Sequence, residues 1–184
     1  MSSKKKSDKN PAKITALAQH YIDVFRNGRL ERGMSPEELS KEISPFEGDS
    51  LVRKIENQFT SNKYTPATIK RAMVFLKIPS YIVFPTTLLS SDTLQEKTKL
   101  IILKGMTAIA AVRSLLEEGY FEEGRTRHET WEFANGFYEE KKSEKFFDPA
   151  LEALYNEGKL IKLEPDATNK LIRFQRNPEY DPSE

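Results

Sequence analysis

Proline and glycine divide the first eighty residues into separate helical segments. Each segment opens on a residue that can cap a helix or on a proline suited to a first turn, and apolar residues follow at helical spacing. Glycine or proline then ends the segment. The predicted helices run from Pro11 to Gly33, from Pro36 to Ile43, from Ser50 towards Asn57, and from Pro66 to Pro79. This part of the chain is therefore predicted to be a helical bundle.

The second half begins with helical patterns and ends with extended ones. Thr93-Leu94-Gln95-Glu96 has the form of a capping box and predicts a long helix to about Glu118. Two further helices are expected at about 127–139 and 147–156, and residues 160–174 have a strand–turn–strand pattern. The expected fold is mainly α. Its expected parts are a flexible basic arm (1–10), a helical domain (11–79), an ordered connector (80–92), a second domain ending in a β-hairpin (93–177) and a tail (178–184).

Charge divides the chain in the same way. The formal net charge is +1, but residues 1–80 carry 15 Lys and Arg against 9 Asp and Glu, whereas residues 81–184 carry 14 against 19. A polyanionic partner would therefore meet the first half. There is no cysteine, and no apolar run is long enough to span a membrane, so we expect a cytoplasmic protein without a membrane partner.

Three segments in the first half together resemble one known motif. The segment Arg32–Ser40 resembles the opening of the Cro/repressor-like helix-turn-helix, which is also called the xenobiotic-response-element family. Val52–Asn57 resembles the end of that family's recognition helix, and Thr65–Ile78 resembles the helix that closes its bundle. The resemblance covers about residues 14–79. It implies a helix-turn-helix bundle that binds double-stranded DNA.

The resemblance also suggests a role for particular side chains. Ser40 is a small residue where the first helix of the motif must touch the second, and Val52 and Ile55 turn one face of the recognition helix into the core. Glu56 resembles an acidic residue that, in family members, contacts the protein's own domain instead of DNA. The turn between Leu39 and Glu56 is two residues longer than the common pattern. The predicted DNA-binding residues are Ser35, Ser50, Arg53, Lys54, Asn57, Gln58 and Lys63.

The second half more weakly resembles a winged helix, because Pro149–Leu160 looks like that family's third helix running into its wing. If the wing contacts phosphates, it would do so through Lys162, Lys170, Arg173 and Arg176. The many glutamates before it oppose DNA, so self-association or partner binding is the favoured role. A set of apolar residues exceeds what one helix face can bury and predicts a symmetric dimer: Leu94, Leu100, Ile101, Ile102, Leu103, Met106 and Ile109.

Sites for catalysis, metals and cofactors are not expected. His128-Glu129-Thr130-Trp131-Glu132 begins like a metalloprotease helix, but Glu132 stands where the second histidine is needed. No phosphate-binding loop or activated nucleophile is evident, so we expect no enzyme. The aromatic residues between Trp131 and Tyr138 have the spacing of a core or of a partner surface.

Two functional hypotheses follow from the sequence. The first is a sequence-specific transcriptional regulator that acts as a homodimer on a two-fold DNA site. The alternative is a protein-interaction adaptor that has the helix-turn-helix fold but does not bind DNA. The longer turn and the near-neutral total charge favour the adaptor, whereas the motif and the basic first half favour the regulator.

Overall fold

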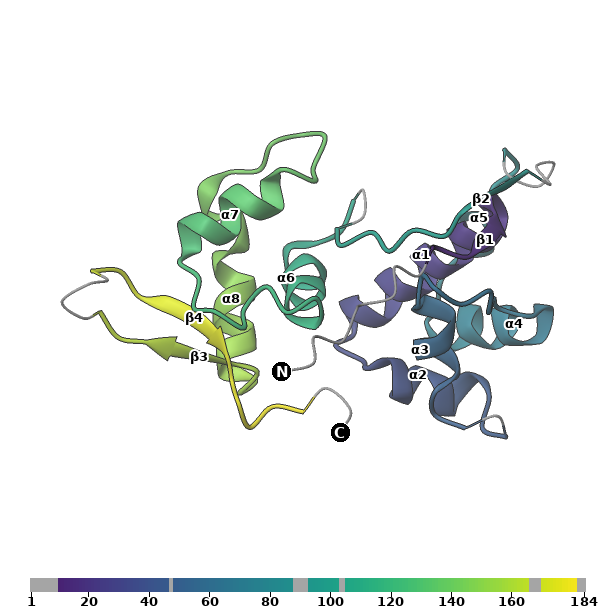
Figure 1. The fold of residues 1–184 in the computed structure, drawn as a ribbon, viewed down its shortest axis with the longest axis horizontal. Helices are drawn as coiled ribbons and strands as arrows, with labels where there is room; N and C mark the ends of the chain where they lie inside the picture. Colours follow the sequence, from purple (N-terminus) through teal and green to yellow (C-terminus); the bar gives the residue numbers. More distant parts are fainter. Residues whose placement is uncertain (1–9, 47, 88–92, 103–104, 166–169, 182–184) are drawn as a thin grey trace, which may run out of the picture. The chain divides into compact units, whose positions relative to one another are not determined.

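The computed structural model of the chain describes residues 10–46, 48–87, 93–102, 105–165 and 170–181 (Figure 1). The fold is mainly helical, as predicted, with two small antiparallel sheets. The chain forms two compact units: the first holds residues up to Arg26 together with Pro36–Lys99, and the second holds Asn27–Ser35 and the residues from Leu100 onward. Much of the basic arm, the end of the connector, the hairpin turn and the end of the tail fall outside the described residues.

The first unit contains a strand pair that the sequence did not reveal. Its elements are β1 (Lys13–Thr15), α1 (Ala16–Glu31, of which the part up to Arg26 belongs here), α2 (Pro36–Ile43), α3 (Leu51–Glu56), α4 (Pro66–Phe75), α5 (Ser80–Val83) and β2 (Leu94–Glu96). β1 and β2 are antiparallel, with Ile14 opposite Gln95. The Lys97 amide extends the pairing by donating to the Ala12 carbonyl at 2.7 Å.

That strand pair corrects two expectations. The first helix begins at Ala16 instead of Pro11, and Thr93–Glu96 leads into a strand instead of a long helix. Both segments satisfy their backbone groups by pairing with each other, which the local capping patterns did not indicate. The connector also differs from the extended segment that was expected, because Ser80–Val83 forms a single helical turn. α4 ends at Phe75, ahead of Pro79.

Local signals do explain the other ends of the helices. Thr65 accepts a hydrogen bond from the Thr68 amide, and the Thr68 side chain accepts from the Thr65 amide, which makes a capping box for α4. Gly33 follows α1 with φ +71°, and the next amide, from Met34, donates to the Arg29 carbonyl at 3.0 Å. Glycine adopts this left-handed conformation without steric cost, so it stops the helix at the predicted position.

The first unit is held together by apolar side chains from each of its helices. Phe25 of α1 is fully buried and meets Tyr64 edge to face, with 4.9 Å between the ring centroids. The buried apolar residues of this unit include Ile14, Ile22, Phe25, Leu39, Ile43, Val52, Ile55, Tyr64, Ile69, Leu76 and Val83. α2 contacts both α3 and α4, so its position controls how α3 is presented.

The second unit has three α-helices followed by a hairpin. Its elements after Leu100 are α6 (Ala108–Glu117), α7 (Arg127–Asn135), the 3₁₀ turn η1 (Glu144–Phe147), α8 (Asp148–Asn156), β3 (Leu160–Leu163) and β4 (Arg173–Arg176). β3 and β4 pair antiparallel with Leu160 opposite Arg176, and α8 packs on β3, so the predicted hairpin is confirmed. Arg125, between α6 and α7, adds a bridge to Phe174 of β4.

The apolar residues predicted to form a dimer face do not share one helix. Ile102 and Met106 are buried in the core of the second unit, whereas Leu94 lies in β2 of the first unit and is exposed. Leu103 lies outside the described residues. The prediction of one continuous helix with more apolar surface than it can bury is therefore wrong. Within the described ranges, no helix is long and apolar enough to cross a membrane.

Candidate nucleic-acid interface

A single buried hydroxyl joins α2 to the start of α3. Ser40 of α2 is fully buried, and its Oγ accepts a hydrogen bond from the Val52 amide at 2.9 Å. The same hydroxyl donates to the Pro36 carbonyl at 2.8 Å. Ser50 stands at the N-cap of α3 but makes no side-chain capping bond. One of the first amides of α3 is thus satisfied from the neighbouring helix, which fixes the position of α3 against α2 (Figure 1).

The two faces of α3 divide as predicted. Val52 and Ile55 are fully buried, whereas Arg53 and Lys54 are exposed. Arg53 also makes an ion pair that the sequence did not suggest, because its Nε lies 2.5 Å from Oε1 of Glu37 on α2. The Arg53 side chain stays 59% exposed, while that of Glu37 is 14% exposed. Glu37 therefore holds the base of the guanidinium group and leaves most of the side chain facing solvent.

The other predicted residues are spread beyond α3. Asn57 is exposed just after the helix, and its Oδ1 accepts a hydrogen bond from the Phe59 amide at 2.9 Å. Gln58 is half-buried, and Lys63 is exposed in the following loop. Ser35 differs from all of these because it belongs to the second unit, where it lines a small cavity. The fold thus gathers Ser50, Arg53, Lys54, Asn57 and Gln58 on α3 or at its ends.

Lys97 supports the loop after α3 and was missed by the sequence analysis. Its side chain is buried, and Nζ donates to the carbonyls of Thr60 and Asn62 at 3.0 and 3.1 Å. Burial lowers the pKa of Lys97 to about 8, against the opposing attraction of Glu56. The only local pattern near Lys97 was the apparent capping box at 93–96, which predicted a helix. Its burial depends on the pairing of β2 with β1.

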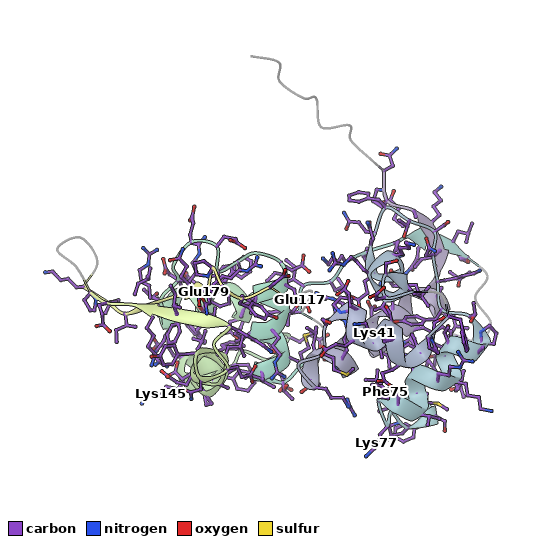
Figure 2. All side chains as sticks on the ribbon, turned by 90° about the horizontal axis from the view of Figure 1, so that it is seen from below. Lys41, Phe75, Lys77, Glu117, Lys145 and Glu179 are labelled. Carbon is purple, nitrogen blue, oxygen red and sulfur yellow. The ribbon has the colours of Figure 1, made fainter. Side chains whose placement is uncertain are left out.

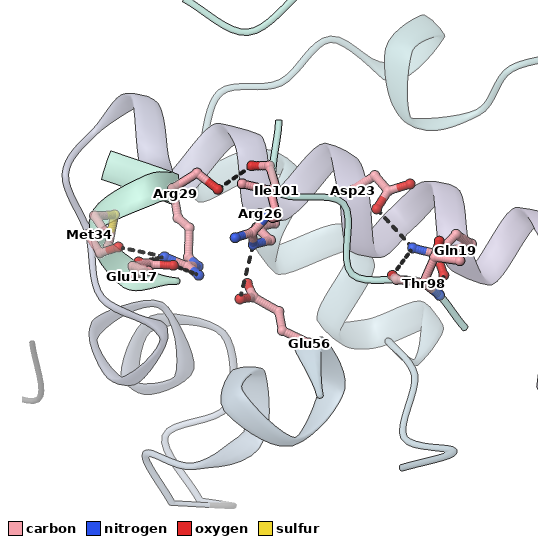
Figure 3. A network of polar contacts seen from close by, with 10 residues as sticks. Gln19, Asp23, Arg26, Arg29, Met34, Glu56, Thr98, Ile101 and Glu117 are labelled. Atoms are coloured by element: carbon pink, nitrogen blue, oxygen red, sulfur yellow. Dashed lines mark hydrogen bonds and ion pairs between the residues drawn. The ribbon is translucent and has the colours of Figure 1, made fainter. Parts of the chain in front are cut away.

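Polar side chains on α1 contact other segments of the first unit (Figure 3). Arg26 and Glu56 are both buried and form an ion pair of 3.8 Å, so Glu56 is held within its own fold as expected. The Gln19 Nε2 donates to Asp23 Oδ1 at 2.8 Å and to the Thr98 carbonyl at 3.0 Å. Burial raises the pKa of the Asp23 carboxyl group to about 6, although the hydrogen bond from Gln19 lowers it.

In the second unit, carboxylates already engage two of the four predicted wing cations. Lys162 Nζ donates to Glu152 Oε2 at 2.7 Å, and this hydrogen bond is the main reason that the pKa of Glu152 is lowered. Arg176 donates to Glu122 Oε1 at 2.8 Å. The other two predicted wing cations, Arg173 and Lys170, are half-buried and exposed, respectively. The hairpin is therefore electrostatically less positive than its lysines and arginines suggest.

Histidine and carboxylate chemistry adds no further site. His128 is exposed on α7, and its Nδ1 lies 2.9 Å from Glu144 Oε1. In the part of the chain that the structure describes, no group of three or more potential ligands is arranged to hold a metal ion. Comparisons with protein-family models, with curated proteins and with solved structures found no match for this chain.

Proposed function

We propose that this chain binds double-stranded DNA through α3, in the manner of a Cro/repressor-like helix-turn-helix, and regulates transcription. The observation that carries the proposal is the pairing of α2 with α3 through Ser40, which leaves Arg53 and Lys54 exposed on a helix whose other face is buried. A helix with one buried face and a basic outer face fits the major groove, where its side chains can reach base edges.

The exposed side chains on and after α3 differ in what they can recognise. Arg53 can donate to O6 and N7 of guanine. Its ion pair with Glu37 already restricts the rotamers of the side chain, so less conformational entropy is lost when DNA binds. Lys54 offers a further donor, while Asn57 suits adenine. Lys63 lies in the loop after the helix and suits a phosphate. Ser35 and the wing residues are proposed only as secondary contacts.

Fluorescence anisotropy with a labelled duplex pool tests the proposal directly. The intact chain is expected to bind, with an affinity that falls as salt rises, because bound phosphates release counterions. Arg53→Gln is expected to weaken binding to a selected site by about 5- to 100-fold, the range for loss of one bidentate base contact. Lys63→Gln is expected to weaken all sequences similarly and to reduce the salt slope by about 1.

Lys145→Gln is the matched control, because it removes the same charge from an exposed position of η1 in the second unit (Figure 2). Equal losses for Lys145→Gln and Lys63→Gln would mean that only net charge matters. Absence of salt-dependent binding to any duplex would favour the adaptor function. Phe46, which precedes α3 and is 95% exposed, is the observation that favours that alternative, since an exposed aromatic side chain can anchor a protein partner.

For the second unit we propose a winged-helix-like fold that joins two copies of the chain. Support comes from the order α6, α7, α8, hairpin, and from the Arg125–Phe174 bridge that adds a third backbone segment to the hairpin. A dimer would present two copies of α3 to half-sites about one helical turn apart. Sedimentation equilibrium of the intact chain tests this directly. A monomer at about 100 μM, well above the dissociation constant of most specific interfaces, would exclude the homodimer.

A further inference from the structure

Three aromatic rings form a continuous surface on the second unit, which we name the aromatic platform: Tyr120, Phe133 and Phe137. The Tyr120 and Phe133 rings stack with centroids 4.5 Å apart and an interplanar angle of 21°. Phe133 and Phe137 lie 5.4 Å apart. Phe133 is 40% exposed and Phe137 is 41% exposed, whereas Tyr120 is half-buried and packs against the core of the second unit. Exposed rings in mutual contact are typical of protein-interaction surfaces.

α7 and its surroundings hold two of the three rings, those of Tyr120 and Phe133, in place. The buried side of α7 carries Thr130, Ala134 and Asn135, which orients Phe133 outward on the same helix. The Tyr120 hydroxyl donates to the Glu129 carbonyl at 3.0 Å. A capping box between Thr126 and Glu129 fixes the start of the helix. Rings that are already ordered lose little conformational entropy when a partner covers them.

Glutamates are frequent in the segment that carries these rings. Residues 120–142 contain six glutamates against two arginines and two lysines, a net charge of −2, and Glu122 and Glu123 already pair with Arg176 and Arg125. Glu132, Glu139 and Glu140 are exposed on α7 and just after Phe137. Burial raises the pKa of Tyr120, the Arg125 charge lowers it, and the charges of Glu129 and Glu132 raise it. This surface would repel a nucleic-acid backbone and attract a cation.

One cation of the chain already lies on the platform. The Arg125 guanidinium carbon is 5.0 Å from the centroid of the Tyr120 ring, within the range of a cation–π contact. The phenylalanine rings offer similar faces for a cation from another molecule. Guanidinium groups suit this surface because they stack on rings and donate to carboxylates at the same time.

We infer that the aromatic platform binds an arginine- or lysine-rich segment of a partner protein. Cationic side chains of the segment stack on Phe133 and Phe137, and the surrounding glutamates pair with their neighbours. This interaction uses the second unit and a different class of partner, so it is independent of DNA binding by α3. A chain of this kind would carry a protein recruitment surface as well as a DNA-binding surface.

Titration of the intact chain with acetylated, amidated nona-arginine tests the inference. Trp131, the only tryptophan, lies on α7, so its emission reports binding next to the platform, and calorimetry gives the affinity. The double variant Phe133→Ser/Phe137→Ser is expected to bind about 5- to 30-fold more weakly, the range for the loss of two exposed cation–π contacts. Glu132→Gln is expected to weaken binding about twofold, as for an exposed ion pair.

Tyr155→Ser is the matched control, because Tyr155 is also a 40% exposed aromatic residue of the second unit but lies on α8. It should bind nona-arginine as the unmodified chain does. Far-UV circular dichroism checks that each variant is folded. Equal affinity for the double variant and the unmodified chain would overturn the inference, because it would show charge attraction without the rings. So would the absence of binding at about 1 mM peptide, or a Trp131 response to a DNA duplex in place of the peptide.

Discussion

Replacing Ser40 with alanine should destabilise the first unit more than replacing the serine at the N-cap of α3. Ser40→Ala removes the hydroxyl that accepts a hydrogen bond from the buried amide of Val52, at a position that is itself fully buried. An unsatisfied buried donor costs about 1–3 kcal/mol. Alanine's better helix propensity in α2 returns about 0.5 kcal/mol. The free energy of unfolding should therefore fall by roughly 1.5 kcal/mol.

Ser50→Ala is the matched comparison. Ser50 stands where a capping residue belongs, yet its side chain makes no capping bond, so its loss should change the free energy of unfolding by less than about 0.5 kcal/mol. Urea unfolding followed by far-UV circular dichroism measures both variants, with the slope m unchanged between them. Trp131 fluorescence gives a separate record of the second unit. If Ser50→Ala costs as much as Ser40→Ala, the cap from α2 is not what orders α3.

Four further substitutions test other parts of the structure. The Asp23 carboxyl group has a pKa of about 6 in the fold against 3.8 ordinarily, so its ionisation costs stability as the pH rises from about 4 to 7. Asp23→Asn should therefore stabilise the chain by about 3 kcal/mol in urea unfolding at pH 7.5, and should make no such difference at pH 4. Thr126→Ala should cost about 1 kcal/mol in unfolding followed by Trp131 fluorescence, because it removes one half of a capping box. The pKa of Glu129 is lowered, chiefly by the hydrogen bond from the Thr126 amide, so its stabilising effect should be present above pH 4.5 and lost as the pH falls. If Glu129→Gln lost as much stability at low pH as the unmodified chain, this explanation would be contradicted. Gly33→Ala should lower the free energy of unfolding by more than about 1 kcal/mol, because φ is +71° and a Cβ would lie 3.0 Å from the Arg113 guanidinium carbon. A variant that is more stable in thermal unfolding would refute the requirement for glycine at this helix end.

Helix ends that are determined by residues nearby in the sequence were predictable. The capping residue Thr65 and the stop at Gly33 act within one turn of the helices they bound, so their patterns survive in the sequence. The β1–β2 pair was not predictable, because it joins residues about eighty positions apart and each strand is only three residues long. β1 alternates between polar and apolar residues over only three positions, and β2 does not alternate, so neither has the pattern that identifies a longer strand.

The same distinction holds at the candidate interface. The i, i+3 spacing of Val52 and Ile55 predicts which side of α3 is buried, and hence that Arg53 faces outward. The ion pair between Arg53 and Glu37 depends on how α3 crosses α2, and the sequence contains no signal for that crossing. The burial of Lys97 likewise depends on a strand pairing that no local pattern indicates.

The path of the chain restricts where the protein could be divided into separate folding domains, because each unit is made of two sequence segments. The second unit includes Asn27–Ser35, which lies more than sixty positions before the rest of that unit, with the α2–α5 helices inserted between. Leu30 is in its hydrophobic core, and Arg29 pairs with Glu117 at 2.6 Å (Figure 3). A crossover or gene fusion that cuts anywhere between residues 36 and 99 would take this core segment away from its partners. A single crossover point in that range therefore cannot transfer either unit whole.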